Sequence, residues 1–151
     1  TKHYKYTKEN IQKIYSKLYN NINKKNLQLV VIPSMRTPLE TIKLAKEYFG
    51  SNHLIIENVD KKAYLSGLSL ANFIVVMCDS SSMISEAALT GKPIYVAQIP
   101  SSKNDYRFKK FRDLFKQLNI IKELNDNLET WNYERLDETN RVAQEIKKKL
   151  I

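Results

Sequence analysis

The sequence predicts an α/β protein with a mostly parallel sheet, because segments typical of strands and of helices alternate along most of the chain. The strand-like segments are short, apolar, rich in β-branched residues and closed by proline or by polar residues. This pattern is typical of strands that a parallel sheet buries on both faces. With right-handed crossovers, the alternation predicts a Rossmann-like, three-layer domain. We expect strands at residues 27–32, 53–57, 73–78 and 94–99, and a short strand end at residues 120–121.

The segments between these strands have the spacing of amphipathic helices. Residues 7–25 place apolar side chains three and four positions apart, and Thr7 is the expected N-cap. The next helix is expected to begin with a capping box at residues 37–40, which has a proline at its first helical position. Residues 125–132 are expected to be irregular. Further helices are expected at residues 60–71, 83–90, 106–118 and 134–151.

Length and residue types narrow the possible functions. A chain of 151 residues predicts a single domain, residues 1–151. The single cysteine, Cys78, excludes an internal disulfide framework and a cysteine-based zinc site. The sequence has no glycine-rich dinucleotide motif, no Walker-type phosphate loop and no serine-hydrolase motif, so neither a metal nor a cofactor is expected. We expect His53 and Cys78 to serve the fold rather than chemistry.

Charge favours an anionic ligand. The chain has 25 Lys and Arg against 16 Asp and Glu, a formal net charge of +9. This charge attracts nucleic acids, acidic membranes or phosphorylated metabolites. The lysines are scattered, so most are expected on solvated helix faces, and no specific nucleic acid is expected as a partner. No apolar run is long enough to cross a membrane. We expect a cytoplasmic protein, with attachment to a membrane surface as the alternative.

Polar residues follow the first predicted strand, at the point where a helix begins. Ser34, Arg36 and Thr37 occupy this junction. Ligands of open parallel sheets bind at the carboxyl ends of the strands, and a helix start offers unpaired amides and a favourable dipole to an anion. Arg36 adds a cation whose geometry suits phosphate. The simpler alternative is a capped helix with a solvated arginine.

A second junction follows the third predicted strand. Asp79, Ser80, Ser81 and Ser82 come directly before a helix, and three hydroxyls exceed what one N-cap needs. Backbone amides together with serine hydroxyls can hold a diphosphate. Glu86, four residues after Ser82, shares its helix face and could accept hydrogen bonds from a ribose. The simpler alternative is an N-cap with a carboxylate placed favourably near the helix start.

A third segment, residues 101–112, is loop-like and then basic. It follows the end of the fourth predicted strand, so it could close over the same crevice. We include Arg107 from this segment among the residues expected to bind substrate. The alternative is that its charges form a solvated helix face.

The segments that carry these residues resemble a known family. Four of them, in the same order, are similar to motifs of the mitochondrial-fission ELM-type family, and the resemblance covers roughly residues 28–120. Met35 stands where the family motif has a basic residue, and residues 61–62 stand where it has Asn-Pro. The four segments are residues 33–38, which resemble a Ser-Arg-Arg-Thr-Pro motif, residues 63–65 with 70–72, residues 75–87 with 91–96, and residues 107–111.

The resemblance implies a function for this domain. Family members resemble GT-B glycosyltransferases, which have two Rossmann-like domains and bind the nucleotide-sugar donor in the C-terminal one. This chain resembles that C-terminal half. By this resemblance the serines at residues 80–82 would face the diphosphate, Glu86 the ribose, and Arg36 the phosphate charge. The expected partners are a nucleotide sugar or nucleoside diphosphate and an N-terminal domain of the same protein, which would hold the catalytic base.

Two other functions remain open at this point. The domain could be a non-catalytic module that keeps the fold and binds a protein or a membrane, since plant members of the family are linked to recruiting a fission GTPase to mitochondria. Nucleic-acid binding through net charge is the least favoured, because few aromatic residues stand among the lysines. The sequence does not identify catalytic residues. Whether the protein is an enzyme is also left open.

Overall fold

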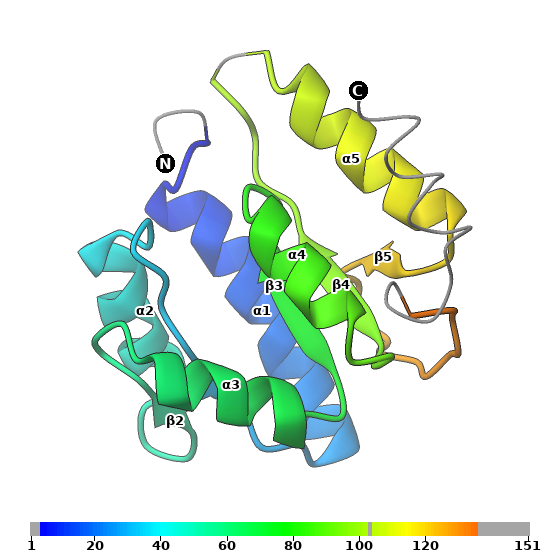
Figure 1. Cartoon of the computed structure of the whole chain (residues 1–151). Coiled ribbons are helices and arrows are strands. Elements are labelled where there is room, and N and C mark those ends of the chain that lie inside the picture. Colours follow the sequence, from blue (N-terminus) through cyan, green and yellow to red (C-terminus); the bar gives the residue numbers. More distant parts are fainter. Residues whose placement is uncertain (1–3, 103, 136–151) are drawn as a thin grey trace. The chain divides into compact units, whose positions relative to one another are not determined.

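The computed structural model of the chain describes residues 4–102 and 104–135. In this part of the chain helices and strands alternate, and every pairing between its strands is parallel (Figure 1). The predicted Rossmann-like α/β class is confirmed. The residues form two compact units, which are described separately. The first contains residues 4–70, Ile99–Ser102 and Asn125–Leu128, and the second contains Ala71–Gln98, residues 104–124 and residues 129–135.

That residues 1–151 form a single domain stays a prediction. The helix predicted at residues 134–151 lies almost entirely outside the described residues.

Across the part of the chain that is described, no helix has both the length and the apolar character needed to span a bilayer.

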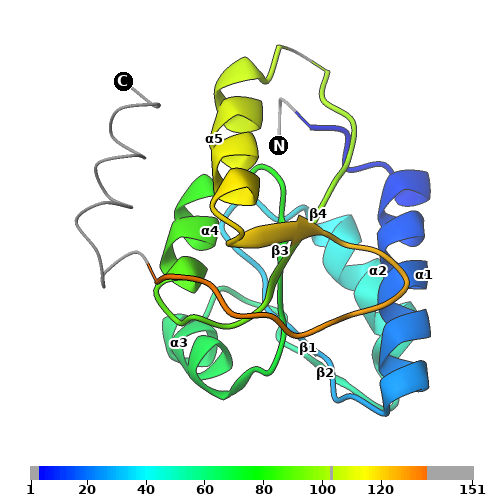
Figure 2. The ribbon, with the colours of Figure 1, turned by 90° about the vertical axis from the view of Figure 1, so that its right-hand side faces the viewer.

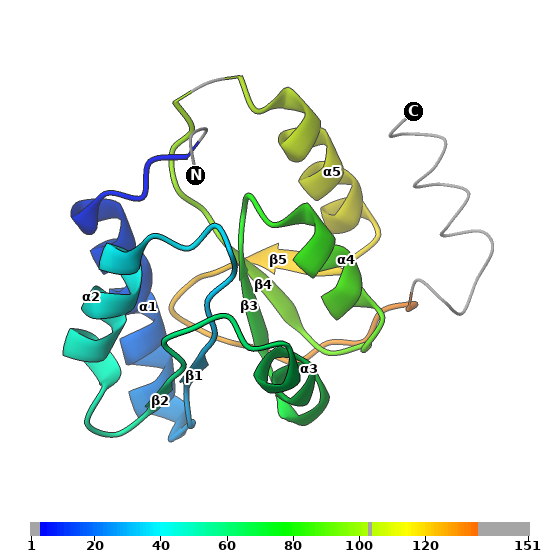
Figure 3. The same ribbon diagram turned by 60° about the vertical axis from the view of Figure 1, so that its left-hand side comes forward.

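The first unit packs helices on a two-stranded parallel sheet. β1 and β2 pair with Val30 opposite Leu54, and α1 lies beside α2 (Figure 3). Thr7 caps α1 as predicted, because its hydroxyl accepts a hydrogen bond from the Asn10 amide at 3.2 Å. The elements are α1 (Lys8–Lys25), β1 (Val30–Val31), α2 (Leu39–Phe49), β2 (Leu54–Ile55) and α3 (Lys61–Leu70).

Aromatic side chains hold α1 and α2 together. Tyr15 is 6% exposed, its ring lies 5.4 Å from that of Phe49, and its hydroxyl donates to the Thr41 carbonyl at 2.9 Å. Phe49 in turn contacts the ring of His53, whose Nδ1 accepts from the Leu29 amide at 3.0 Å. His53 therefore joins the chain ahead of β1 to that ahead of β2, the structural role expected of it.

A buried asparagine fastens an irregular segment to α1. Asn21 is fully buried, and its amide group donates to the carbonyls of Lys17 and Asn125 at 2.9 and 2.8 Å. Its Oδ1 accepts from the Leu128 amide at 3.0 Å. All these bonds lie within the first unit, and they satisfy backbone groups that burial would otherwise leave unpaired.

The second unit is a three-stranded parallel sheet in the order β3-β4-β5. The order follows the chain, and α4 and α5 contact each other on one face (Figure 2), as two successive crossovers of the same hand require. The central strand, β4, is buried at every position, as predicted for a strand covered on both faces. The elements are β3 (Ile74–Met77), α4 (Ser81–Ala88), β4 (Ile94–Ala97), α5 (Tyr106–Gln117) and β5 (Ile121–Glu123).

The segment after residue 128 is irregular, as predicted, but it is firmly bound to the second unit. The Tyr95 hydroxyl accepts from the Glu129 amide at 2.7 Å, and the Trp131 indole donates to the Asn119 carbonyl at 2.7 Å. The Tyr133 hydroxyl donates to the Lys92 carbonyl at 2.6 Å. Lys92 precedes β4 and Asn119 precedes β5, so this segment crosses the amino-terminal ends of both strands.

Replacing Asn21 by alanine should destabilise the protein by about 2–3 kcal/mol, because the buried Leu128 amide and the Asn125 carbonyl both lose their partner. Urea unfolding followed by circular dichroism measures the loss. Asn20→Ala is the matched control, since Asn20 is exposed on the same helix. Equal stabilities of the two variants would contradict the role given to Asn21.

Alkaline unfolding should depend on Tyr15, because burial raises the pKa of Tyr15 to about 12. Between pH 10 and 12 the folded protein holds a proton that the unfolded chain releases, so stability falls as pH rises through this window. This difference between the pKa values of Tyr15 in the folded and unfolded states corresponds to roughly 3 kcal/mol of stability. Tyr15→Phe should be less stable than wild type at pH 7, and the gap should close near pH 11 in thermal melts.

Tyr19→Phe is the control for this pH series, because Tyr19 is 48% exposed. Its stability curve should follow that of wild type across the whole range. A constant gap between wild type and Tyr15→Phe from pH 7 to pH 11.5 would show that Tyr15 does not carry the pH dependence.

Candidate functional site

The junction between β3 and α4 contains backbone amides and serine hydroxyls that have no hydrogen-bond partner within residues 4–102 and 104–135. We call residues 79–82 the serine turn. Ser80 is the N-cap of α4, yet its side chain makes no capping bond, and the first helical bond runs from the Ile84 amide to the Ser80 carbonyl at 2.9 Å. Among the described residues, the amides of Ser81, Ser82 and Met83 and the hydroxyls of Ser80, Ser81 and Ser82 have no hydrogen-bond partner. Six donors therefore stand together at the carboxyl end of β3.

Burial separates the residues of the serine turn into two kinds. Ser82 and Glu86 are exposed, and Ser80 and Ser81 are partly exposed. Asp79, by contrast, is 3% exposed. Its carboxylate belongs to the interior of the fold, whereas the serines and Glu86 are the groups that a molecule in solution can reach.

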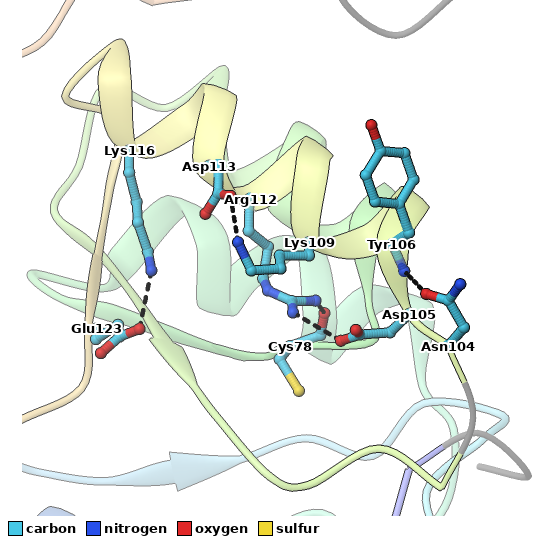
Figure 4. A network of polar contacts seen from close by, with 9 residues as sticks. All are labelled: Cys78, Asn104, Asp105, Tyr106, Lys109, Arg112, Asp113, Lys116 and Glu123. Carbon is cyan, nitrogen blue, oxygen red and sulfur yellow. Dashed lines mark hydrogen bonds and ion pairs between the residues drawn. The ribbon is translucent and has the colours of Figure 1, made fainter.

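A buried arginine from α5 holds the chain just before the serine turn. Arg112 is 5% exposed, and its guanidinium donates to the Cys78 carbonyl at 2.9 Å and to the Asp105 carboxylate at 3.1 Å (Figure 4). Asp105 is the N-cap of α5 but uses its side chain for this ion pair instead of capping the helix. The Cys78 amide donates to the Ala97 carbonyl of β4 at 3.0 Å. The end of β3 is thus fixed from two sides.

The other charged residues of α5 lie at its surface. Arg107 is exposed, and Lys109 pairs with Asp113 at 2.9 Å. This hydrogen bond raises the pKa of Lys109 and lowers that of Asp113. Lys116 pairs with Glu123 at 2.8 Å (Figure 4).

Sequence reasoning selected Arg107 from this basic segment and missed Arg112. The available signal was helical spacing. Arg112 lies four residues after Phe108 and three before Phe115, and therefore on the apolar face of α5. A charged residue on the buried face of a helix must have partners, which singles it out from solvated neighbours.

The junction between β1 and α2 has a different construction, and the capping box predicted at Thr37 is wrong. α2 begins at Leu39 with Pro38 as its N-cap, and Pro38 offers no side-chain acceptor. The Thr37 hydroxyl instead accepts from the Ser34 amide at 2.8 Å, and the Ser34 hydroxyl accepts from the Arg36 amide at 3.3 Å. The cause is local competition, since short hydroxyl side chains bond neighbouring amides in turns as readily as they cap helices.

These bonds close a tight turn at residues 34–37. Ser34 and Thr37 spend their hydroxyls inside it, whereas Met35 and Arg36 are exposed at its tip. Of the three residues expected to bind substrate here, Arg36 is the exposed one, and the binding role of all three stays a prediction. The turn belongs to the first unit and the serine turn to the second. That both line one pocket stays a prediction.

The described residues contain no group of three or more His, Cys, Asp or Glu side chains that could hold a metal ion.

Parallel β-α-β units with polar turns after their strands define a Rossmann-like α/β protein whose candidate site is a strand-to-helix junction. The chain belongs to the mitochondrial fission ELM1 family, whose model matches residues 1–150.

Two curated relatives have a similar sequence. A protein of Rickettsia prowazekii (strain Madrid E) that is described as uncharacterised is 30% identical over 147 residues, which are 92% of this chain and 41% of that protein. The mitochondrial fission protein ELM1 of Arabidopsis thaliana is 27% identical over 122 residues, 78% of this chain and 28% of that protein. The chain therefore spans less than half the length of these relatives. No solved structure matches.

Thr37→Val should loosen the turn at residues 34–37, because the Ser34 amide loses its acceptor. We expect faster hydrogen exchange at the Ser34 amide and about 1 kcal/mol lower stability. Thr41→Val, the same chemical change in the first turn of α2, should leave this exchange rate unaltered. Unchanged protection of Ser34 in Thr37→Val would show that the hydroxyl does not hold the turn.

Proposed function

We propose that this chain binds the diphosphate of a nucleoside diphosphate or a nucleotide sugar at the serine turn. The observation that carries the proposal is the set of amides and hydroxyls at the start of α4 that have no partner among the described residues. Backbone amides at a helix start, aided by the helix dipole, are a recurrent means of binding phosphate oxygens. Serine hydroxyls that do not cap the helix are available for the same oxygens.

Glu86 extends this proposal from a phosphate to a nucleotide. Glu86 is exposed four residues after Ser82, on the same face of α4, where a carboxylate can accept hydrogen bonds from a ribose. Arg107 is an exposed cation of the same unit that can offset phosphate charge, and Arg36 is an exposed cation of the first unit for which we propose the same chemistry toward a phosphate. In this proposal Asp79 shapes the turn from inside, and Ser34 and Thr37 shape the loop that presents Arg36.

The proposed activity requires more than this chain. A bound diphosphate that is stabilised by amides and arginine is a good leaving group, so a glycosyltransferase-like reaction is the activity we propose for the longer protein. The catalytic base would come from an N-terminal domain, in keeping with relatives more than twice as long as the matched region. We propose the cytoplasm as the compartment.

The similarity to a mitochondrial fission protein favours a second candidate function. The same fold could serve as a non-catalytic module that binds a protein or attaches to a membrane surface, with its net charge of +9 directed at an acidic partner. Such a module has no need for a nucleotide. Nucleotide binding therefore discriminates between the two functions.

Adenosine, guanosine and uridine diphosphates should each be tested for thermal stabilisation of the protein. At 100 times its dissociation constant, a ligand adds about 2.7 kcal/mol of stability. Ser82→Ala and Glu86→Ala should each reduce the gain, whereas Ser85→Ala, one turn further along α4, should keep it. Absence of any gain at millimolar concentrations, together with salt-sensitive binding to acidic vesicles, would favour the second function.

A further inference from the structure

We propose that Arg112 is the positioning residue of the serine turn, and that its hydrogen bonds to the Cys78 carbonyl and to Asp105 set the affinity of this turn for a diphosphate. The inference rests on the proposed function, which it deepens by naming a residue that acts without touching the ligand. With 5% of its surface exposed, Arg112 cannot serve as a surface cation. Its effect on a ligand passes through the backbone that it holds.

The contacts show how this effect reaches the turn. Cys78 is fully buried, and its amide and carbonyl are held by β4 and by Arg112 respectively. Two residues later, the Ser80 amide donates to the Met77 carbonyl at 3.1 Å, which closes the chain into the N-cap of α4. The position of the Cys78 carbonyl therefore determines where the amides of the following residues stand.

Asp105 makes the guanidinium a bridge rather than a single contact. Its carboxylate lies 3.1 Å from Arg112 with a side chain 25% exposed, and it neutralises a charge that could not otherwise be buried. The planar guanidinium reaches the carbonyl with Nη1 and the carboxylate with Nη2. A lysine carries the same charge on a single nitrogen and cannot reproduce this fork.

The bridge connects the two crossovers of the second unit. Cys78 precedes α4, whereas Asp105 and Arg112 belong to the start and the middle of α5. Because preorganised donors bind an anion without reordering, a turn held in this way binds more tightly than the same turn left free. We therefore expect the protein to keep its fold but to lose affinity for a diphosphate when the guanidinium of Arg112 is replaced by the single charged nitrogen of a lysine.

The test is isothermal titration calorimetry of the whole chain with uridine diphosphate and with inorganic pyrophosphate. Arg112→Lys should weaken binding of both probes at least tenfold, with unchanged far-ultraviolet circular dichroism. Lys116→Met, which removes an exposed cation one turn along α5, should stay within twofold of wild type. The amide resonances of Ser81 and Ser82 should shift in ligand-free Arg112→Lys, while those of Lys116→Met stay in place.

Asp105→Asn provides a second variant should Arg112→Lys fail to fold, since it keeps an acceptor and removes only the charge. It should also weaken both probes and shift the same resonances. If wild type binds the probes and the folded Arg112 or Asp105 variants bind them equally well, the positioning role is overturned and the proposed function stands. If wild type binds neither probe, the proposed function fails and the inference fails with it.

Discussion

Burial of the Arg112 guanidinium is the constraint on which the second unit depends. A charge that leaves water must be matched by a nearby charge and by hydrogen bonds, and here Asp105 and the Cys78 carbonyl supply both. These partners lie at the end of β3 and at the start of α5, so satisfying one side chain fixes the strand end against a helix. The serine turn follows directly from that fixed point.

The two strand-to-helix junctions show that the hydroxyls of similar polar sequences can have opposite roles. Ser34 and Thr37 use theirs to close a turn, which leaves Arg36 as the group presented to solvent. The three serines at residues 80–82 use none within the described residues. The backbone around them is held by Arg112 and by β4 instead, so these hydroxyls are not needed for the fold. External support of this kind would allow the serine turn to offer its polar groups to the proposed ligand.

Periodicity and residue type predicted most of the architecture. The apolar strands, the amphipathic α1 with its Thr7 cap, and the structural role of His53 all follow from local patterns. The errors arose where several local outcomes have similar energies. A threonine before proline can cap a helix or close a turn. Thr37 closes a turn, because its hydroxyl accepts from the Ser34 amide. Arg112 was overlooked for a different reason: it stands in a basic segment with Arg107, and helical spacing, rather than residue type, distinguishes the buried arginine from the exposed one.

The distribution of charge indicates that local geometry, rather than the net charge of +9, would select an anion. Several of the lysines in the described chain already pair with neighbouring carboxylates, among them Lys13 with Glu9, Lys43 with Glu40 and Lys109 with Asp113. Such exposed pairs contribute little energy and leave a weak, diffuse field that salt screens. A strand-to-helix turn concentrates amide and hydroxyl donors within the reach of one diphosphate, at distances where screening is ineffective. Under the proposed function, specificity for a phosphate-bearing ligand would therefore come from the serine turn, and the lysines would do no more than raise the rate of encounter.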